Sequence, residues 1–283
     1  MSPATALRPL PPAAPTMAPR AQVRSIFSRG VPDTVRVEDR GVDGLSRMHP
    51  WVGISLVRSP TLVSVESRRD VVADRNWIVL IPPFELHDLR PQGEAAQGAV
   101  TLLLGGSQIE GIDIANLPAL ITDHALGEKL ASLVADVQHG VRSDEQTTAI
   151  RSMLEQLLLC SMPIAPGRAP RFSRLTRVRT FLHTHVSDPV SIEDLARMSA
   201  LSECHLISAF RYEFGLPPHA YHLRLRLASA CEALARGMAV ASVAYEYGFA
   251  DQSHLSRKFK SVYGVSPAAW ATRRAGTLRS ARS

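Results

Sequence analysis

The sequence predicts a two-domain protein, with a β-rich amino-terminal domain followed by helices, and an all-helical carboxyl-terminal domain. Three observations lead to this fold class. The chain has 283 residues, about twice the usual length of one domain. Residues 30–105 alternate short β-branched segments with turn residues. The carboxyl-terminal part, in contrast, repeats a helical segment at an offset of 49 residues.

Composition indicates a folded, water-soluble chain, with 45% hydrophobic and 20% charged residues. Cys160, Cys204 and Cys231 are widely spaced and form no CxxC pair, which favours reduced thiols inside the cell. Residues 1–22 hold six prolines and are expected to be a disordered tail rather than an export signal. No apolar run approaches the roughly 20 residues that span a bilayer, so we expect a cytoplasmic protein without a membrane role.

Charge is divided unevenly along the chain. Residues 1–166 contain 15 Lys and Arg against 18 Asp and Glu, whereas residues 167–283 contain 17 against 8. The whole net charge of +6 therefore comes from the carboxyl-terminal part. A basic domain of this kind favours a polyanionic partner such as nucleic acid, although a solvated basic surface is an equal alternative on charge alone.

Four segments of the amino-terminal half are expected to be strands because they are β-branched, alternate in polarity and are bounded by turn residues. They are residues 34–38, 52–57, 61–65 and 77–81. Their short spacing predicts an antiparallel barrel or sandwich. Apolar residues at helical spacing predict two helices after it, at 117–138 and 144–160.

The repeat in the carboxyl-terminal half aligns residues 202–215 with residues 251–264. Each copy has an N-cap residue, Ser202 or Asp251, and a glycine at its end, which predicts a short capped helix. The matching pairs are His205/His254, Leu206/Leu255, Phe210/Phe259, Arg211/Lys260 and Gly215/Gly264, followed by Pro218/Pro267 and Tyr221/Trp270.

Another short helical segment precedes each repeated helix, which is the helix-turn-helix pattern. The first begins with a capping-box-like pattern at Ser191 and ends in a turn at 199–201; the second spans 240–247 and ends at Gly248. Between the two copies, Pro217 and Pro218 open a helix that ends at Gly237 and is expected to act as a rigid spacer. Its apolar stripe is Tyr221, Leu225, Ala228, Cys231 and Leu234.

Residues 171–274 resemble the DNA-binding domain of the AraC/XylS family of bacterial transcription regulators. The resemblance rests on residues 248–267, GFADQSHLSRKFKSVYGVSP, and less closely on the first copy with Tyr221, Arg226 and Ala230. It implies seven helices in two helix-turn-helix units whose recognition helices enter successive major grooves of promoter DNA. It also implies an effector-binding and dimerisation domain (23–162) and a DNA-binding domain (171–274). Composition adds a proline-rich tail (1–22), a Pro/Gly/Arg-rich linker (163–170) and a basic tail (275–283).

The resemblance also implies which side chains face the DNA. Gln and Arg are suited to bidentate pairing with adenine and guanine, and an apolar residue to contact with thymine methyl groups. The residues expected to face bases are Cys204, Ile207 and Ser208 in the first recognition helix, and Gln252, Ser253, His254 and Arg257 in the second. Arg211, Lys258 and Lys260 are expected to contact phosphates, with a solvated cation as the alternative for Arg211 and Lys260.

Residues 76–87 resemble the cupin-type sensor domain of the same family, which implies a barrel that holds a small organic effector, through lining residues that are not assigned. His49 and His87 lack the His-x-His spacing of metal-binding cupins, so no metal or cofactor is expected. No GxSxG, HExxH, P-loop or GxGxxG motif is present, and no catalytic residue is assigned. A homodimer formed by the helices at 117–138 and 144–160 is implied, and contact with RNA polymerase is left open. The alternatives are a metal-dependent cupin enzyme tethered to DNA and a constitutive regulator without a ligand.

Overall fold

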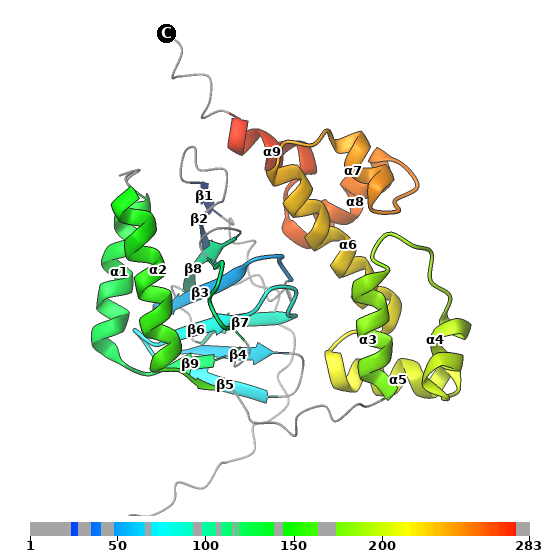
Figure 1. Ribbon diagram of the computed structural model, residues 1–283, viewed down its shortest axis with the longest axis horizontal. Coiled ribbons are helices and arrows are strands. Elements are labelled where there is room, and N and C mark those ends of the chain that lie inside the picture. The colour runs from blue at the N-terminus through cyan, green and yellow to red at the C-terminus, as the bar shows by residue number, and fades with distance from the viewer. Residues whose placement is uncertain are drawn as a thin grey trace, which may run out of the picture.

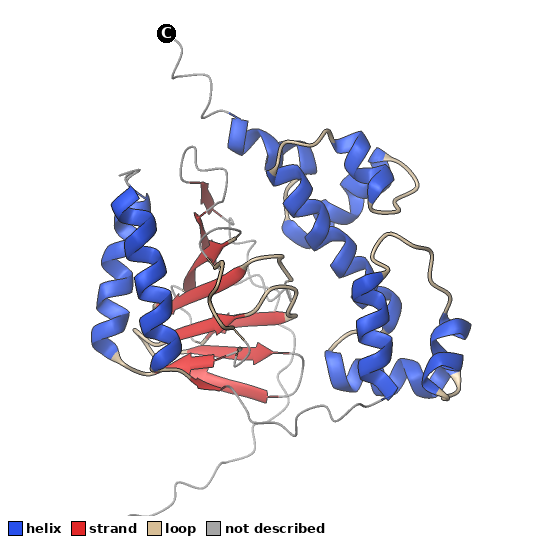
Figure 2. Cartoon of the chain, in the orientation of Figure 1, coloured by secondary structure: helices blue, strands red, loops and turns tan. Residues whose placement is uncertain are grey.

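The computed structural model describes residues 24–27, 35–40, 48–65, 69–92, 98–105, 109–114, 117, 119–138, 144–163 and 174–275. Two β-sheets lie between a pair of helices on one side and a helical carboxyl-terminal domain on the other (Figure 1). Figure 2 shows that the strands gather in one region, apart from the helices of the carboxyl-terminal domain. The predicted tail at 1–22, residues 276–283 of the predicted basic tail at 275–283, and residues 164–170 of the predicted linker lie outside the described residues.

The described residues of the amino-terminal domain form two antiparallel sheets, which agrees with the sandwich alternative and not with a closed barrel. One sheet has seven strands in the order β1-β2-β8-β3-β6-β9-β10, and the other has three in the order β5-β4-β7. Within the described residues, no strand of the small sheet pairs with a strand of the large one. The strands are β1 (Arg24–Phe27), β2 (Val35–Arg40), β3 (Val52–Val57), β4 (Thr61–Val65), β5 (Arg69–Ala73), β6 (Ile78–Ile81), β7 (His87–Pro91), β8 (Ala99–Leu104), β9 (Ala119–Ile121) and β10 (Met162–Pro163).

The strands β3, β6 and β8 of the large sheet are buried on both faces. Every residue of β3, β6 and β8 is buried. Successive side chains point to opposite faces. One face packs on the small sheet, since Val57, Val79 and Ile81 share a core cluster with Val63 and Leu89. The other face is covered by helices instead of by further strands.

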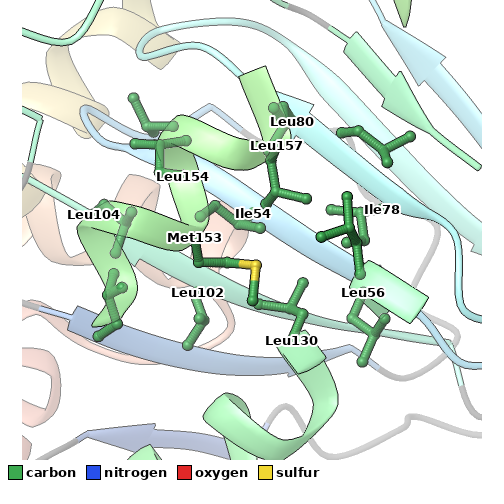
Figure 3. Close-up of a cluster of buried hydrophobic side chains, with 14 of the residues drawn as sticks. Ile54, Leu56, Ile78, Leu80, Leu102, Leu104, Leu130, Met153, Leu154 and Leu157 are labelled. Carbon is green, nitrogen blue, oxygen red and sulfur yellow. The ribbon is translucent and has the colours of Figure 1, made fainter. Parts of the chain in front are cut away.

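The pair α1 (His124–Gln138) and α2 (Asp144–Leu159) covers that second face. Figure 3 shows Leu130 of α1 together with Met153, Leu154 and Leu157 of α2 against the sheet residues Ile54, Leu56, Ile78, Leu80, Leu102 and Leu104. The predicted helix at 144–160 is confirmed. The prediction of a helix from residue 117 is wrong, because residues 119–121 pair with β6 as strand β9, and α1 begins only after Asp123, which caps it.

Seven helices, as the family resemblance implies, form the carboxyl-terminal domain within residues 174–275. The helix α6 runs from one helix-turn-helix unit to the other (Figure 1), and its predicted stripe from Tyr221 to Leu234 is buried. The helices are α3 (Arg174–Thr184), α4 (Ile192–Ser199), α5 (Glu203–Phe214), α6 (Pro218–Ala235), α7 (Val240–Glu246), α8 (Gln252–Tyr263) and α9 (Pro267–Ala275).

The two domains share buried surface. Trp51 and Leu103 belong to the core cluster of α6 to α9, while Met48 and Leu86 belong to the core cluster of α3 to α6. Two polar contacts connect the same regions. The Tyr263 hydroxyl donates to the backbone oxygen of Met48 at 3.0 Å, and the Arg179 guanidinium donates to the Glu85 carboxylate at 3.0 Å. The β-domain is therefore docked on the helical domain through both apolar and ionic contacts.

Candidate nucleic-acid interface

The repeated segment forms the same structure twice. The Ser202 hydroxyl accepts a hydrogen bond from the backbone N–H of His205 at 3.3 Å, and the Asp251 carboxylate accepts one from His254 at 2.7 Å. The bond to His254 lowers the pKa of Asp251, because the ionised carboxylate accepts it more strongly than the protonated acid does. The helices α5 and α8 then end at Gly215 and Gly264, both in the left-handed conformation.

Both helices bury one face and expose the other. Leu206 and Phe210 of α5 are fully buried, as are their counterparts Leu255 and Phe259 of α8. Because residues four apart share a face of a helix, each pair fixes which side of its helix points to the core. The opposite side of each helix is free to meet a partner.

The residues expected to face bases lie on these outer sides, with one exception. Cys204, Ser208, Gln252, Ser253 and Arg257 are exposed, and Ile207 is 38% exposed although it is apolar.

His254 is only partly exposed, because its ring contacts the Phe249 ring at 5.6 Å between centroids. Its Nδ1 also accepts a hydrogen bond from the backbone N–H of Ala250 at 3.4 Å. This histidine thus supports the turn before α8.

The residues expected to contact phosphates are all exposed: Arg211, Lys258 and Lys260. Arg211 and Lys260 occupy equivalent positions in the last turns of α5 and α8. A cation at that end of a helix also interacts favourably with the helix dipole. These two residues therefore have an intrahelical role in addition to any role toward an anion.

The helices that precede α5 and α8 differ in their caps. In α4, the Ser191 hydroxyl accepts the N–H of Asp194 at 3.0 Å and donates to its carboxylate at 2.6 Å. This hydroxyl bond, followed by that from Arg197, lowers the pKa of Asp194. The tight turn to α5 places Ala200 in the left-handed conformation, at φ 51°. Helix α7 has no side-chain cap, since Ala239 precedes it.

The junction between the two units contains a functional group that sequence reasoning did not assign. Arg226 of α6 donates hydrogen bonds to backbone oxygens of both units, and Gly248 lies against it. A pocket of about 350 Å³ opens beside them and is lined by Ser187, Pro189, Val190, His219, His222, Leu223, Arg226 and Gly248. Burial lowers the pKa of both Arg226 and His222, and the Arg226 charge contributes at His222. From the sequence, Gly248 is expected to end the segment 240–247 and Arg226 is part of the family resemblance, but neither residue is assigned to this junction.

The histidines of the amino-terminal domain are buried and hydrogen-bonded to the backbone. His49 Nδ1 donates to the oxygen of Trp51 at 2.7 Å, and His87 Nδ1 donates to that of Glu85 at 2.9 Å. The two rings lie edge to face, with 4.8 Å between centroids. Among the described residues, no group of three or more His, Cys, Asp or Glu is arranged to hold a metal ion.

No helix in the described part of the chain combines the length and apolar character that crossing a membrane requires.

Comparison with known proteins places these units in a family. Residues 195–273 match the family of helix-turn-helix domains, a range that contains both capped helices and the spacer between them. The chain carries an AraC-type double helix-turn-helix domain.

The curated relatives of the chain are named as transcription regulators. The HTH-type transcriptional activator RhaS of Escherichia coli is 31% identical over 150 residues, which are 51% of this chain and 54% of RhaS. The probable transcriptional regulator LumQ of Photobacterium leiognathi is 27% identical over 120 residues, which are 42% of this chain and 48% of LumQ. The chain spans about half the length of the curated relatives that it matches.

The two-domain layout also has a counterpart among solved structures. The apo form of a variant of ToxT from Vibrio cholerae superposes with a TM-score of 0.51, at 12% identity, over 87% of this chain and 99% of ToxT. The AraC-type domain therefore follows an amino-terminal β-domain here as it does in that fold.

Proposed function

We propose that this protein is a transcription regulator that binds promoter DNA with α5 and α8, which act as two recognition helices. The observation that carries the proposal is their equivalence, since both are capped alike, buried on the same side and exposed on the other. An excess of nine positive charges in residues 167–283 supports attraction to the DNA backbone. The names of RhaS and LumQ support the same class. A protein with this role acts in the cytoplasm, where bacterial promoters are.

The second recognition helix is proposed to read bases mainly through Gln252 and Arg257. Arg257 is exposed on α8, and Arg can pair bidentately with guanine, for about 1 to 3 kcal/mol of discrimination. Ser253 lies one turn before Arg257, on the same side of the helix. His254 takes part through its exposed fraction only, because its ring packs on Phe249.

The first recognition helix is proposed to contact bases through Cys204, Ile207 and Ser208. Ile207 is apolar and 38% exposed, which suits contact with thymine methyl groups. Ser208 occupies the position equivalent to Arg257, so this helix lacks the group best suited to guanine. The two half-sites are therefore expected to differ in sequence.

Selection of genomic fragments by the purified protein at about 150 mM salt tests the proposal, because non-specific binding is weakened there. A few enriched sites are expected. On such a site Arg257→Ala should weaken binding about 5- to 150-fold and leave non-specific affinity nearly unchanged. Lys258→Ala, at a proposed phosphate contact, should weaken both kinds of binding alike. Equal losses on both DNAs for Arg257→Ala would refute its assignment.

The amino-terminal domain is proposed to bind a small organic effector and to change how the DNA-binding domain engages its site. Support comes from the fold, because wild-type ToxT, which superposes with a TM-score of 0.50, has been solved with an unsaturated fatty acid bound. An effector acts only through different affinities for two arrangements of the protein. Footprints with and without added oleate and other small acids test this, and an unchanged footprint with all of them favours a constitutive regulator.

The domain organisation and oligomeric state belong to the same proposal. Residues 23–162 would form the effector and dimerisation domain, 163–170 the linker and 171–274 the DNA-binding domain. The pair α1 and α2 is proposed as the homodimer contact, because it lies on the side of the sheet opposite the helical domain (Figure 1) and its residue Leu159 is 87% exposed. Sedimentation across a dilution series tests this, and a monomer at micromolar concentration would contradict it. No enzymatic step is proposed.

A further inference from the structure

One side chain connects the two helix-turn-helix units at the level of their backbones. The Arg226 guanidinium donates to the oxygens of Val186 at 2.9 Å, Asp188 at 2.6 Å and Ser187 at 3.4 Å, which follow α3 in the first unit. The same group donates to the oxygen of Gly248 at 3.1 Å, which follows α7 in the second unit. Arg226 itself lies near the middle of α6, the helix that joins the units.

The units approach each other too closely for any residue but glycine at position 248. Gly248 has φ of +69°, in the left-handed region. A Cβ atom there would lie 2.3 Å from the Ser187 oxygen and 3.3 Å from the Arg226 Cζ atom. A substitution would therefore push the backbones of the two units apart at the point where Arg226 joins them.

A second residue of α6 supports the same contact. His222 lies one turn before Arg226, and its Nε2 donates to the oxygen of His185 at 3.0 Å. The segment 185–188 is irregular, and these two side chains supply hydrogen bonds to its carbonyl groups. Only the planar fork of an arginine, with five N–H donors, can serve several carbonyl groups in two directions; a lysine ammonium cannot reproduce that geometry.

We infer that Arg226 and Gly248 are positioning residues that hold α5 and α8 in one relative orientation, and thereby determine which separation of the two half-sites on DNA is accepted. The inference rests on the proposed DNA-binding function. One base pair of added spacing moves the second half-site by about 3.4 Å along the duplex and about 34° around it. Two helices on a rigid frame tolerate such a change poorly, whereas two loosely joined units follow it.

The test measures affinity for the enriched operator with its two half-sites moved by up to two base pairs in either direction, using the full-length protein. The unsubstituted chain should lose about tenfold or more for a shift of one base pair. Arg226→Lys and Gly248→Ala should flatten this dependence to about twofold and leave affinity for non-specific DNA unchanged. The matched control is Arg236→Ala at the C-cap of α6, because Arg236 forms an ion pair with Glu232 of that helix. That variant should keep the sharp profile.

A spacing profile for Arg226→Lys as sharp as that of the unsubstituted chain, with a uniform loss of affinity, would overturn the inference and leave the proposed function standing. Absence of any preferred sequence for the unsubstituted protein would instead overturn the proposed function.

If the protein shows no preferred DNA sequence, a measurement without DNA still tests whether Arg226 fixes the orientation of α5 relative to α8. Cys204 and position 253 are equivalent in the repeat, so spin labels on Cys204 and on Ser253→Cys, in a Cys160→Ser background, report the distance between α5 and α8. Labelled chains diluted with unlabelled protein should give one narrow distance distribution, and Arg226→Lys should broaden it. Equal widths in both proteins would overturn the inference.

Discussion

The ion pair between Glu85 and Arg179 is expected to hold the two domains together, and its removal should weaken their docking measurably. Glu85 lies in the turn before β7, and Arg179 lies on α3. Their nitrogen and oxygen atoms are 3.0 Å apart, and the side chains are 8% and 26% exposed, respectively. Arg179 also donates to the Tyr221 hydroxyl at 3.1 Å, so it contributes inside the helical domain as well.

The magnitude follows from burial. At an effective dielectric constant of about 20, opposite charges at this distance attract by about 5 kcal/mol. Removing two such groups from water offsets much of this attraction. We therefore expect a net coupling free energy of about 1 to 3 kcal/mol between Glu85 and Arg179. Exposed pairs, in comparison, contribute about 0.2 to 1 kcal/mol.

A double-mutant cycle isolates that coupling from the contact with Tyr221. Glu85→Gln, Arg179→Ala and the double variant are compared with the unsubstituted chain by urea unfolding, followed by far-UV circular dichroism and tryptophan fluorescence. The matched control is the pair Glu193 and Arg197 within α4, at 3.1 Å but with both side chains more than 60% exposed. Its coupling should stay below about 0.5 kcal/mol.

The reasoning would be refuted by additive effects. If the energies of Glu85→Gln and Arg179→Ala add to within about 0.5 kcal/mol, the pair contributes no more than an exposed one. The docking of the domains would then depend on the apolar contacts around Trp51 and Met48 and on the hydrogen bond from Tyr263 to Met48.

Three further predictions concern stability. Burial lowers the pKa of His183 from 6.5 to about 4, so the folded state binds a proton at this side chain less readily than the unfolded state. The neutral His183 therefore stabilises the fold fully above about pH 6.5. This stabilisation is lost as the pH falls toward 4, by up to about 3 kcal/mol. Urea midpoints between pH 7 and pH 4.5 should fall less for His183→Gln, and parallel profiles would contradict this. Ser202→Ala should cost about 1 kcal/mol by removing the cap of α5, unlike the neighbouring Glu203→Ala, which leaves the cap intact; a thermal melt of each variant decides. Leu154→Ala in the fully buried core under α2 should cost about 3 kcal/mol, whereas Leu159→Ala at an exposed position should cost less than about 0.5 kcal/mol, and similar melting temperatures for the two would show that α2 does not pack as described.

Sequence reasoning located β2, β3, β4 and β6 and missed β8 and β9. Residues 61–65 alternate between buried and half-buried positions, and β4 was predicted with its observed bounds. The run 99–104 is apolar except for Thr101 and is buried at every position, so it carries no period that separates a strand from a buried helix. Residues 119–121 were absorbed into a predicted helix for the same reason, since only pairing with β6 makes them a strand.

The candidate interface was predictable from sequence to the extent that it depends on local contacts. The caps at Ser202 and Asp251 join residues three apart, and the buried pairs of α5 and α8 join residues four apart. The role of Arg226 was not predictable from sequence. Its acceptors lie 22 to 40 residues away, and they are backbone carbonyl groups, which every residue type carries.

The sequence by itself determined the two capped helices α5 and α8, because short-range hydrogen bonds and helical periodicity specify them. It also determined the basic charge of residues 167–283, which follows directly from their composition. Only the tertiary structure decided that the β-domain is an open pair of sheets covered by α1 and α2, how the two units are joined at Arg226, and that the β-domain docks on the helices. These features depend on contacts between residues as far apart as Met48 and Tyr263, which are 215 positions apart. Such contacts form only where the folded chain brings two buried surfaces together, so they cannot be predicted from a local sequence pattern.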